Sequence, residues 1–276
     1  VAQSSPPVYI SATVVGSALQ SIGMREMTKA SMVLGGVENG TDPMQIIVAS
    51  LTVKAIGQSD PLLRALNTIS VTLEASLDLA PGTNITLSGL VGTMTDDGAI
   101  AVVSENSSLA ATGLWNRSSG TLVVSTADPL SGMPHMFSFV VRNGGAEQDS
   151  PHVSVSARMV SGAIVALTAL SVPNAELRGV ANGSNPLRLV RPVFSVKQIW
   201  QEYPLVGGRN VLHVQLVASC DLGPSSNITL AGLIGTASDA GNLTLLWNSS
   251  VALAASGAWS RQSGTLVVGV GGVVVG

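Results

Sequence analysis

The chain repeats itself, and no other feature of the sequence constrains its fold as strongly. Three segments of the first half return in the second half with most of their residues unchanged. They are residues 37–43 and 180–186, residues 78–93 and 221–236, and residues 115–124 and 259–268. The two members of each pair lie 142 to 145 residues apart, which is the length of an ordinary domain. The spacing predicts tandem copies of one domain-sized unit.

The composition favours strands over helices. Hydrophobic residues make up 46% of the chain, but aromatic residues only 3% and charged residues only 11%. An ordinary soluble domain carries about 25% charged residues. Small and β-branched side chains dominate instead, and these suit a pleated sheet better than the surface of a helix. We therefore expect an all-β protein.

Short alternating segments support this expectation. Residues 67–75 place Ile69, Val71 and Leu73 on one face and polar residues on the other. Further strands are expected in residues 8–15, 51–56, 83–90, 121–125, 136–141, 153–157, 163–170, 194–199 and 210–218. Residues 17–33 mix polar residues with helix formers, and we expect them to form strand and loop. Gly, Pro, Asn and Asp separate these segments at short intervals, which is typical of an antiparallel β-sandwich.

The repeated segment W-x-R-x-S-G-T-L-V-V predicts a hairpin. Trp115 or Trp259 ends one strand, Gly120 or Gly264 supplies a positive φ, and T-L-V-V begins the return. The two tryptophans have two interpretations, as core anchors or as platforms on which a sugar ring stacks.

The chain holds one complete unit and parts of two others. Residues 1–43 match the late part of a unit, residues 44–175 form a complete sandwich, and residues 187–276 match a sandwich without its last strands. Each partial unit would expose unpaired backbone and half of a core. The two deficits are complementary, so we expect residues 1–43 of one copy to complete the sandwich begun at 187 in another. The alternative is a longer polypeptide, in which further residues complete the partial units. We expect the apolar residues 267–275 to add a strand where the equivalent of residues 133–145 is lacking.

Asparagines in N-x-[ST] sequons account for the water solubility of a chain so poor in charge. The sequons begin at Asn39, Asn84, Asn106, Asn116, Asn182, Asn227, Asn242 and Asn248. Three of them recur between the copies, and N-linked glycans would coat the surface with solubilising sugar. On the segment 83–90, Asn84 and Thr86 face outward while Ile85 and Leu87 face the core. The alternative is that these Asn-Ser/Thr pairs mark turns.

Several partners are excluded by charge and hydropathy. The net charge is −3 and there is no basic patch, so nucleic acid is not expected as a partner. No apolar run approaches the ~18 residues of a spanning helix. The single cysteine, Cys220, is expected to be a small buried hydrophobe, with an intermolecular disulfide as the alternative.

The sequence contains no catalytic signature. It has neither a G-x-S-x-G elbow nor a G-x-x-x-x-G-K-[ST] loop, and its three histidines do not have metal-ligand spacing. Asp96, Asp97 and Asp239 could bind calcium at the end of a domain, but Asp-Gly turns need no ion. We therefore expect no catalytic, cofactor-binding or metal-binding residue and no cofactor, and we expect the protein not to be an enzyme.

With these segments in view, the chain resembles the tandem β-sandwich glycoproteins that algae and other protists secrete. The likeness rests on N-I-T-L-x-G-L-x-G-T, on W-x-R-x-S-G-T-L-V-V and on residues 137–157, F-S-F-V-V-R-N-x(7)-P-x-V-S-V-S-A. The chain is also similar to the immunoglobulin-like repeats of flagellar hairs (mastigonemes) and cell-surface fibres. It lacks the inter-sheet cysteine pair of immunoglobulin domains proper. The resemblance implies tandem immunoglobulin-like sandwiches with a structural role, and it supplies no functional residues.

Together these features predict a structural protomer of an extracellular, N-glycosylated filament or surface fibre. Its partners would be copies of itself, joined head to tail by strand complementation, and its location would be secreted or on the cell surface, as in a flagellar hair. The alternative is a secreted carbohydrate- or surface-binding adhesin, which would need exposed aromatic residues and converging polar groups.

Overall fold

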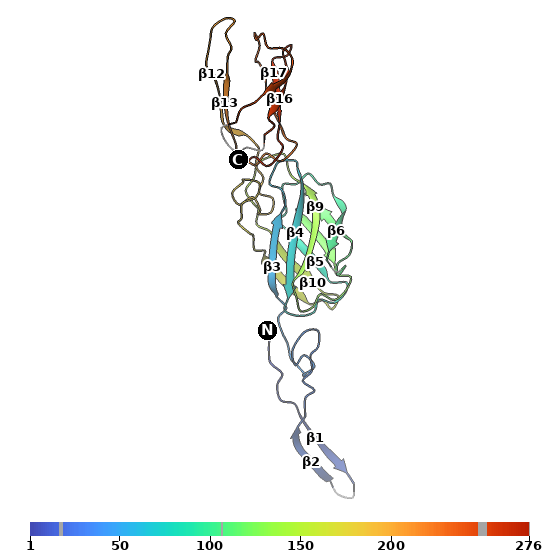
Figure 1. The fold of residues 1–276 in the computed structure, drawn as a ribbon. Coiled ribbons are helices and arrows are strands. Elements are labelled where there is room, and N and C mark those ends of the chain that lie inside the picture. The colour runs from blue at the N-terminus through green and yellow to red at the C-terminus, as the bar shows by residue number, and fades with distance from the viewer. Residues whose placement is uncertain (17–18, 106, 248–252, 276) are drawn as a thin grey trace. The chain divides into compact units, whose positions relative to one another are not determined.

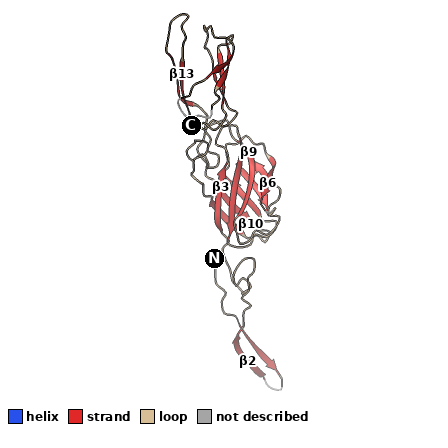
Figure 2. Cartoon of the chain, viewed as in Figure 1, coloured by secondary structure: helices blue, strands red, loops and turns tan. Residues whose placement is uncertain are grey.

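The computed structural model describes the chain except for residues 17–18, 106, 248–252 and 276. The described residues form strands and loops without a helix, so the prediction of an all-β protein is confirmed (Figure 2). All strand pairs are antiparallel. The chain divides into two compact units. The first contains Val1–Pro173 and Ser184–Leu189, and the second contains Asn174–Gly183 and Val190–Gly276.

The first unit contains a hairpin and a large folded sheet (Figure 1). The hairpin consists of β1 (Tyr9–Val15) and β2 (Leu19–Glu26). The sheet has the strand order β11-β10-β5-β8-β7-β6-β9-β4-β3. Its strands are β3 (Leu51–Gln58), β4 (Leu66–Ala75), β5 (Asn84–Ser88), β6 (Gly98–Ser104), β7 (Thr112–Asn116), β8 (Thr121–Ser125), β9 (His135–Arg142), β10 (Ser154–Arg158) and β11 (Ile164–Ala169). Residues 17–33 are expected to form strand and loop, and the described part of them, residues 19–33, does so, with β2 at its start.

The large sheet folds over at β6, so that its two halves enclose one core. Residues 98–101 of β6 pair with β7, and residues 102–104 pair with β9. Figure 1 shows β3, β4 and β9 lying across β5 and β10. The core draws on both halves, and its most buried members include Ile69, Val71, Phe139, Ile85, Leu87, Leu122 and Val155. This is the two-layer arrangement that the alternating strands predicted.

The predicted inward faces are confirmed. Ile69 and Val71 are fully buried and Leu73 is 4% exposed, while Ser70 between them is exposed. Both hairpin tryptophans belong to the cores, because Trp115 is 1% and Trp259 is 5% exposed. Their burial confirms the core-anchor interpretation and removes both from consideration as sugar platforms.

A buried amide cluster, which the sequence pattern did not indicate, joins β3, β4 and β9. Asn67 Nδ2 donates to Gln58 Oε1 and to Asn143 Oδ1, each at 2.8 Å. Asn143 Nδ2 in turn donates to the carbonyl oxygens of Asp60 and Leu62. Buried polar groups cost free energy unless they are hydrogen-bonded. These bonds therefore allow amides to lie at one end of an otherwise apolar core.

The second unit contains two separate sheets. One pairs β12 (Phe194–Gln201) with β13 (Leu212–Ala218). The other has the order β14-β17-β16-β15. Its strands are β14 (Asn227–Leu230), β15 (Gly241–Thr244), β16 (Ser256–Ser260) and β17 (Thr265–Gly269). Its core is small, with Trp259, Leu266 and Val268 at the centre. Cys220 is buried at 1% exposure, as expected.

The second copy of the repeat reproduces unusual backbone conformations of the first. Positive φ angles recur at Asn39 and Asn182 (54° and 55°), Met44 and Leu187 (61° and 54°), and Gly120 and Gly264 (60° and 59°). Large side chains such as Met and Leu rarely adopt this conformation. Equivalent residues of the two copies therefore follow the same backbone path, so contacts made in one copy can be compared with contacts missing in the other.

The expectation that residues 267–275 would add a strand in place of residues 133–145 is wrong. Residues 267–269 belong to β17, which pairs with β14 and β16 inside the second unit. Val274 then pairs with Leu222 in the same unit. The backbone of this segment is already hydrogen-bonded, so it is not free to fill the position between β13 and β15 that β9 fills between β4 and β6.

Candidate functional site: open strand edges

The paired strands β5 and β10 show how a complete unit closes this side of its sheet. Ser156 lies opposite Thr86, and Ala157 lies opposite Ile85. Thr126 N donates to Thr83 O, so the residue before β5 points its backbone groups toward β8. Because successive residues point these groups to alternate sides, Asn84 and Thr86 point theirs toward β10.

The corresponding edge of β14 is open. Val270 N donates to Ser226 O, so the same alternation points the backbone of Asn227 and Thr229 away from β17. Among the described residues, no strand lies on that side of β14. Ile228 and Leu230 are only partly buried, whereas their equivalents in β5 are at most 1% exposed. The β14 edge therefore lacks both hydrogen-bond partners and apolar cover.

The hairpin β1–β2 has the matching deficit. Met27 N donates to Val8 O, just as Leu170 N donates to Val153 O beside β10. β1 pairs only with β2 in the described part of the chain. Ile10 and Ile22 are 57% and 56% exposed, whereas Val155 and Val165 at the equivalent positions of β10 and β11 are 0% and 2% exposed. The apolar side chains of the hairpin are thus exposed, whereas their equivalents in β10 and β11 are buried in the core of the complete unit.

The segment around β1 already has the internal bonds of its buried counterpart. Gln3 and Ile46 exchange backbone hydrogen bonds of 2.8 and 3.0 Å, as Gln148 and Leu189 do at 3.0 and 2.9 Å. Ser5 Oγ donates to Pro43 O at 2.6 Å, and the equivalent bond from Ser150 is 2.7 Å long. Residues 1–46, called here the N-terminal segment, therefore share internal hydrogen bonds with the equivalent residues of the complete unit.

Two glycines of the second unit leave room for such a segment. A Cβ atom on Gly89 would lie 2.1 Å from His152 O, and one on Gly92 would lie 2.1 Å from Gln148 Oε1. Both glycines are therefore needed where the chain before β10 passes. At the equivalent Gly232 and Gly235, a Cβ atom would meet no described atom within 4 Å. Both glycines have positive φ (87° and 81°), which already favours glycine, and the space beside each is open among the described residues.

The structure describes six of the eight sequon asparagines. All six side chains are exposed: Asn39, Asn84, Asn116, Asn182, Asn227 and Asn242. Asn106 and Asn248 lie outside the described residues. Asn116 also supports a turn, because its Oδ1 accepts hydrogen bonds from Ser118 Oγ and Ser119 N. Turn formation and glycan attachment are compatible there, since the glycan is joined to Nδ2.

Asn84 and Asn227 are the sequons for which glycosylation is predicted most directly. Asn84 stays exposed although β8 and β10 flank its strand, so a glycan there does not interfere with strand pairing. We expect both residues to carry glycan in native material, and glycopeptide mass spectrometry is the measurement. Finding both sites bare would contradict the prediction.

Two of the acidic residues considered for calcium, Asp96 and Asp97, contact Arg117. Asp97 Oδ1 accepts a hydrogen bond from Arg117 N at 2.5 Å, and Asp96 lies 4.0 Å from the guanidinium of Arg117. These contacts favour the turn interpretation, with Asp97 supporting the tryptophan hairpin. In the part of the chain that is described, no group of three or more His, Cys, Asp or Glu residues could hold a metal ion. The described residues also contain no helix that is long and apolar enough to cross a membrane.

Comparisons with known proteins do not assign a family to this chain. A scan against protein-family models finds no match, and a search of the curated proteins finds no similar sequence. The open strand edges and the exposed asparagines are therefore the features of the chain that bear on its function.

Proposed function

We propose that this protein is a structural protomer of an extracellular, glycosylated filament built from tandem immunoglobulin-like β-sandwiches. Copies join head to tail, and the N-terminal segment of one copy closes the open β14 edge of the next by strand complementation. The matched deficits of β1 and β14 are the observation that supports this proposal most strongly. Secretion or cell-surface display would follow from N-glycosylation of the exposed sequons.

The intact pair β5–β10 gives the register of the proposed contact. Ser11 would lie opposite Thr229, since Ser156 lies opposite Thr86. Ile10 and Ala12 would then cover Ile228 and Leu230, which would bury the apolar side chains that both partners expose. Backbone hydrogen bonds would supply affinity and the alternate side chains specificity, as in other cases of β-strand addition.

The symmetry of this contact favours a filament. The β1 edge and the β14 edge are different surfaces on the same chain, so the contact is heterologous, and each added copy presents a new β14 edge. An isologous dimer would not leave such an edge. The N-terminal segment contains no equivalent of β9, so this contact closes the β14 side of the sheet and leaves the position between β13 and β15 for another strand.

Sedimentation velocity and negative-stain imaging of residues 1–276 test the proposal. We expect ordered fibres from the full chain and single protomers from a chain without residues 1–43. A truncated chain that still forms fibres with the same repeat and stability would contradict the proposal.

The second candidate function is a carbohydrate-binding adhesin, and one observation favours it. Trp200 is 51% exposed and stacks on His213, with ring centroids 5.2 Å apart. Aromatic faces of this kind can stack on sugar rings. Binding of the unassembled chain to a glycan array, lost on replacement of Trp200 by alanine, would favour the adhesin over the filament.

A further inference from the structure

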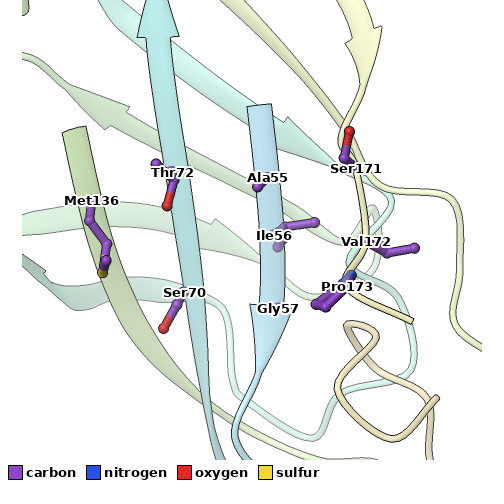
Figure 3. A pocket seen from close by; sticks show the side chains of 9 residues that line it. All are labelled: Ala55, Ile56, Gly57, Ser70, Thr72, Met136, Ser171, Val172 and Pro173. Carbon is purple, nitrogen blue, oxygen red and sulfur yellow. The ribbon is translucent and has the colours of Figure 1, made fainter. Parts of the chain in front are cut away.

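A shallow hollow on the outer face of the first unit marks a second point of contact with the segment that follows β11. The hollow measures about 280 Å³ and lies over β3, β4 and β9 (Figure 3). It is lined by Ala55, Ile56, Gly57, Ser70, Thr72, Met136, Ser171, Val172 and Pro173. Figure 3 shows Ser171, Val172 and Pro173 running beside β3, which is the edge strand of the sheet.

Backbone bonds fix residues 171–173 against β3. Ser171 lies parallel to Ala55, Ile56 N donates to Ser171 O at 3.0 Å, and Ser171 N donates to Lys54 O at 2.8 Å. The segment that contains β10 and β11 thus closes both ends of the sheet, at β5 and at β3. A complementing copy would therefore use the corresponding residues 28–30 on the edge of β12 as well as β1 on the edge of β14.

Gln58 adds a side-chain contact at the same edge. Its backbone N donates to Ser184 O at 3.1 Å, its Oε1 accepts from Leu187 N at 2.7 Å, and its Nε2 donates to Arg188 O at 3.0 Å. The equivalent residue in β12 is Gln201. Its Oε1 accepts from Asn210 Nδ2 at 2.9 Å, as Gln58 accepts from Asn67 at 2.8 Å. Gln201 is therefore held by Asn210, as Gln58 is held by Asn67. Gln58 contacts residues 184–188 in the first unit, whereas Gln201 is exposed in the second.

The residues at the floor of the hollow differ between the two copies, and so do the residues that would lie against them. Gly57 and Ser70 in the first unit correspond to the stacked Trp200 and His213 in the second. A Cβ atom on Gly57 would lie 3.4 Å from Pro173 Cγ, so the glycine leaves room for that proline. In the N-terminal segment the equivalent of Pro173 is Ala30. The internal junction thus combines a glycine with a proline, and the proposed intermolecular junction combines a tryptophan with an alanine.

We propose that Trp200, supported by His213, is a specificity residue for a second copy of this chain and is covered by residues 28–30 of that copy. This inference rests on the proposed function, because it assumes complementation at β14. The large indole accepts the small Ala30 and excludes a proline there, so the contact between chains differs from the contact within a chain. Glu202 holds the imidazole from its other side, with 2.9 Å between Glu202 Oε1 and His213 Nε2.

Tryptophan fluorescence measures directly whether Trp200 becomes buried on assembly. Trp115 and Trp259 are buried, and Trp247 is 41% exposed, so a Trp247→Phe chain leaves Trp200 as the one strongly exposed indole among the three that remain. On assembly of this chain we expect a blue shift of the emission and a loss of iodide quenching. Assembly without either change would overturn the inference and leave the proposed function intact, whereas absence of assembly would overturn the proposed function itself. Protection of Trp200 by oligosaccharide in the unassembled chain would assign it to sugar binding and would also overturn the inference.

A double-mutant cycle tests the size match between the two residues. Ala30→Pro and Trp200→Gly should each weaken association about tenfold or more, the first by a clash and the second by loss of apolar contact. The double variant restores the glycine–proline pair of the internal junction and should recover most of the loss. Independent effects that simply add would contradict the proposed contact. Ala30 is exposed in the protomer, so Ala30→Pro should leave its melting temperature unchanged, whereas Trp200→Gly loses the stacking on His213 and should lower it slightly. An unchanged far-UV circular dichroism spectrum of each variant is the folding control.

Discussion

Replacing Ser11 with proline will weaken end-to-end association by about ten- to hundredfold. Ser11 is the single residue of β1 opposite a bulge in β2 and has no Cα partner there. Val8 O accepts from Met27 N, so the alternation of the strand points the N–H of Ser11 away from β2. In the proposed contact that N–H faces Thr229, and proline removes it. A buried carbonyl left without its donor costs about 1–3 kcal/mol, and each 1.4 kcal/mol changes an association constant tenfold.

Two control variants separate the loss of the N–H at Ser11 from other effects of the substitution. Ser11→Ala keeps the N–H and should assemble like the unmodified chain. Ser156→Pro makes the same change in β10, where the pairing with Thr86 lies inside the folded unit, so it should lower the melting temperature of the protomer instead. Sedimentation velocity over a concentration series gives the association constants. Equal assembly of the Ser11→Pro and Ser11→Ala chains would show that β1 does not pair at this edge.

Replacing Trp115 with alanine will lower the free energy of unfolding of the first unit by about 3–5 kcal/mol. The indole is 1% exposed in the shared core, and its Nε1 donates to Thr95 O at 3.2 Å. The change removes a large packed side chain and leaves Thr95 O without this partner. Chemical denaturation of the purified protomer measures the difference.

The neighbouring Leu114 provides the control for Trp115. It is 65% exposed on the opposite face of β7, and Leu114→Ala should change the stability by less than about 0.5 kcal/mol. If Trp115→Ala left the melting temperature unchanged and abolished binding of a sugar, the adhesin would replace the filament as the better account.

The sequence predicted most strands because strongly alternating segments carry their own signal. It missed β6 (Gly98–Ser104), which has no polar residue between its ends to alternate with the apolar ones, and β15 (Gly241–Thr244), which has a single large apolar residue. β6 is central to the fold, since it pairs with β7 along one half and with β9 along the other. A strand with this role is specified by its neighbours in space, and a local pattern does not reveal them.

The candidate site was predictable in outline only. Comparison of the copies identified the missing late strands, but the amides of Gln201 and Asn210 gave no signal, because a polar residue in an alternating strand is normally assigned to the solvent face. Only the structure of the first unit shows that the buried Gln58, which is held by Asn67, also accepts a hydrogen bond from the backbone of Leu187. The role proposed for Trp200 likewise depends on the structure, which shows that Pro173 lies against Gly57 in the first unit.

Disulfide trapping between β1 and β14 tests the central claim most directly. Ala157 and Ile85 lie opposite each other beside the hydrogen-bonded pair Ser156–Thr86, and their equivalents are Ala12 and Ile228. Opposed residues of this kind have Cα atoms about 4.5 Å apart, within the range that a disulfide spans. The Ala12→Cys, Ile228→Cys chain should oxidise into a ladder of covalent multimers on non-reducing gels. The control carries Cys at 12 and 229, which faces the other side of the strand, and should stay monomeric. Equal crosslinking of both chains, or monomers from both, would contradict the account.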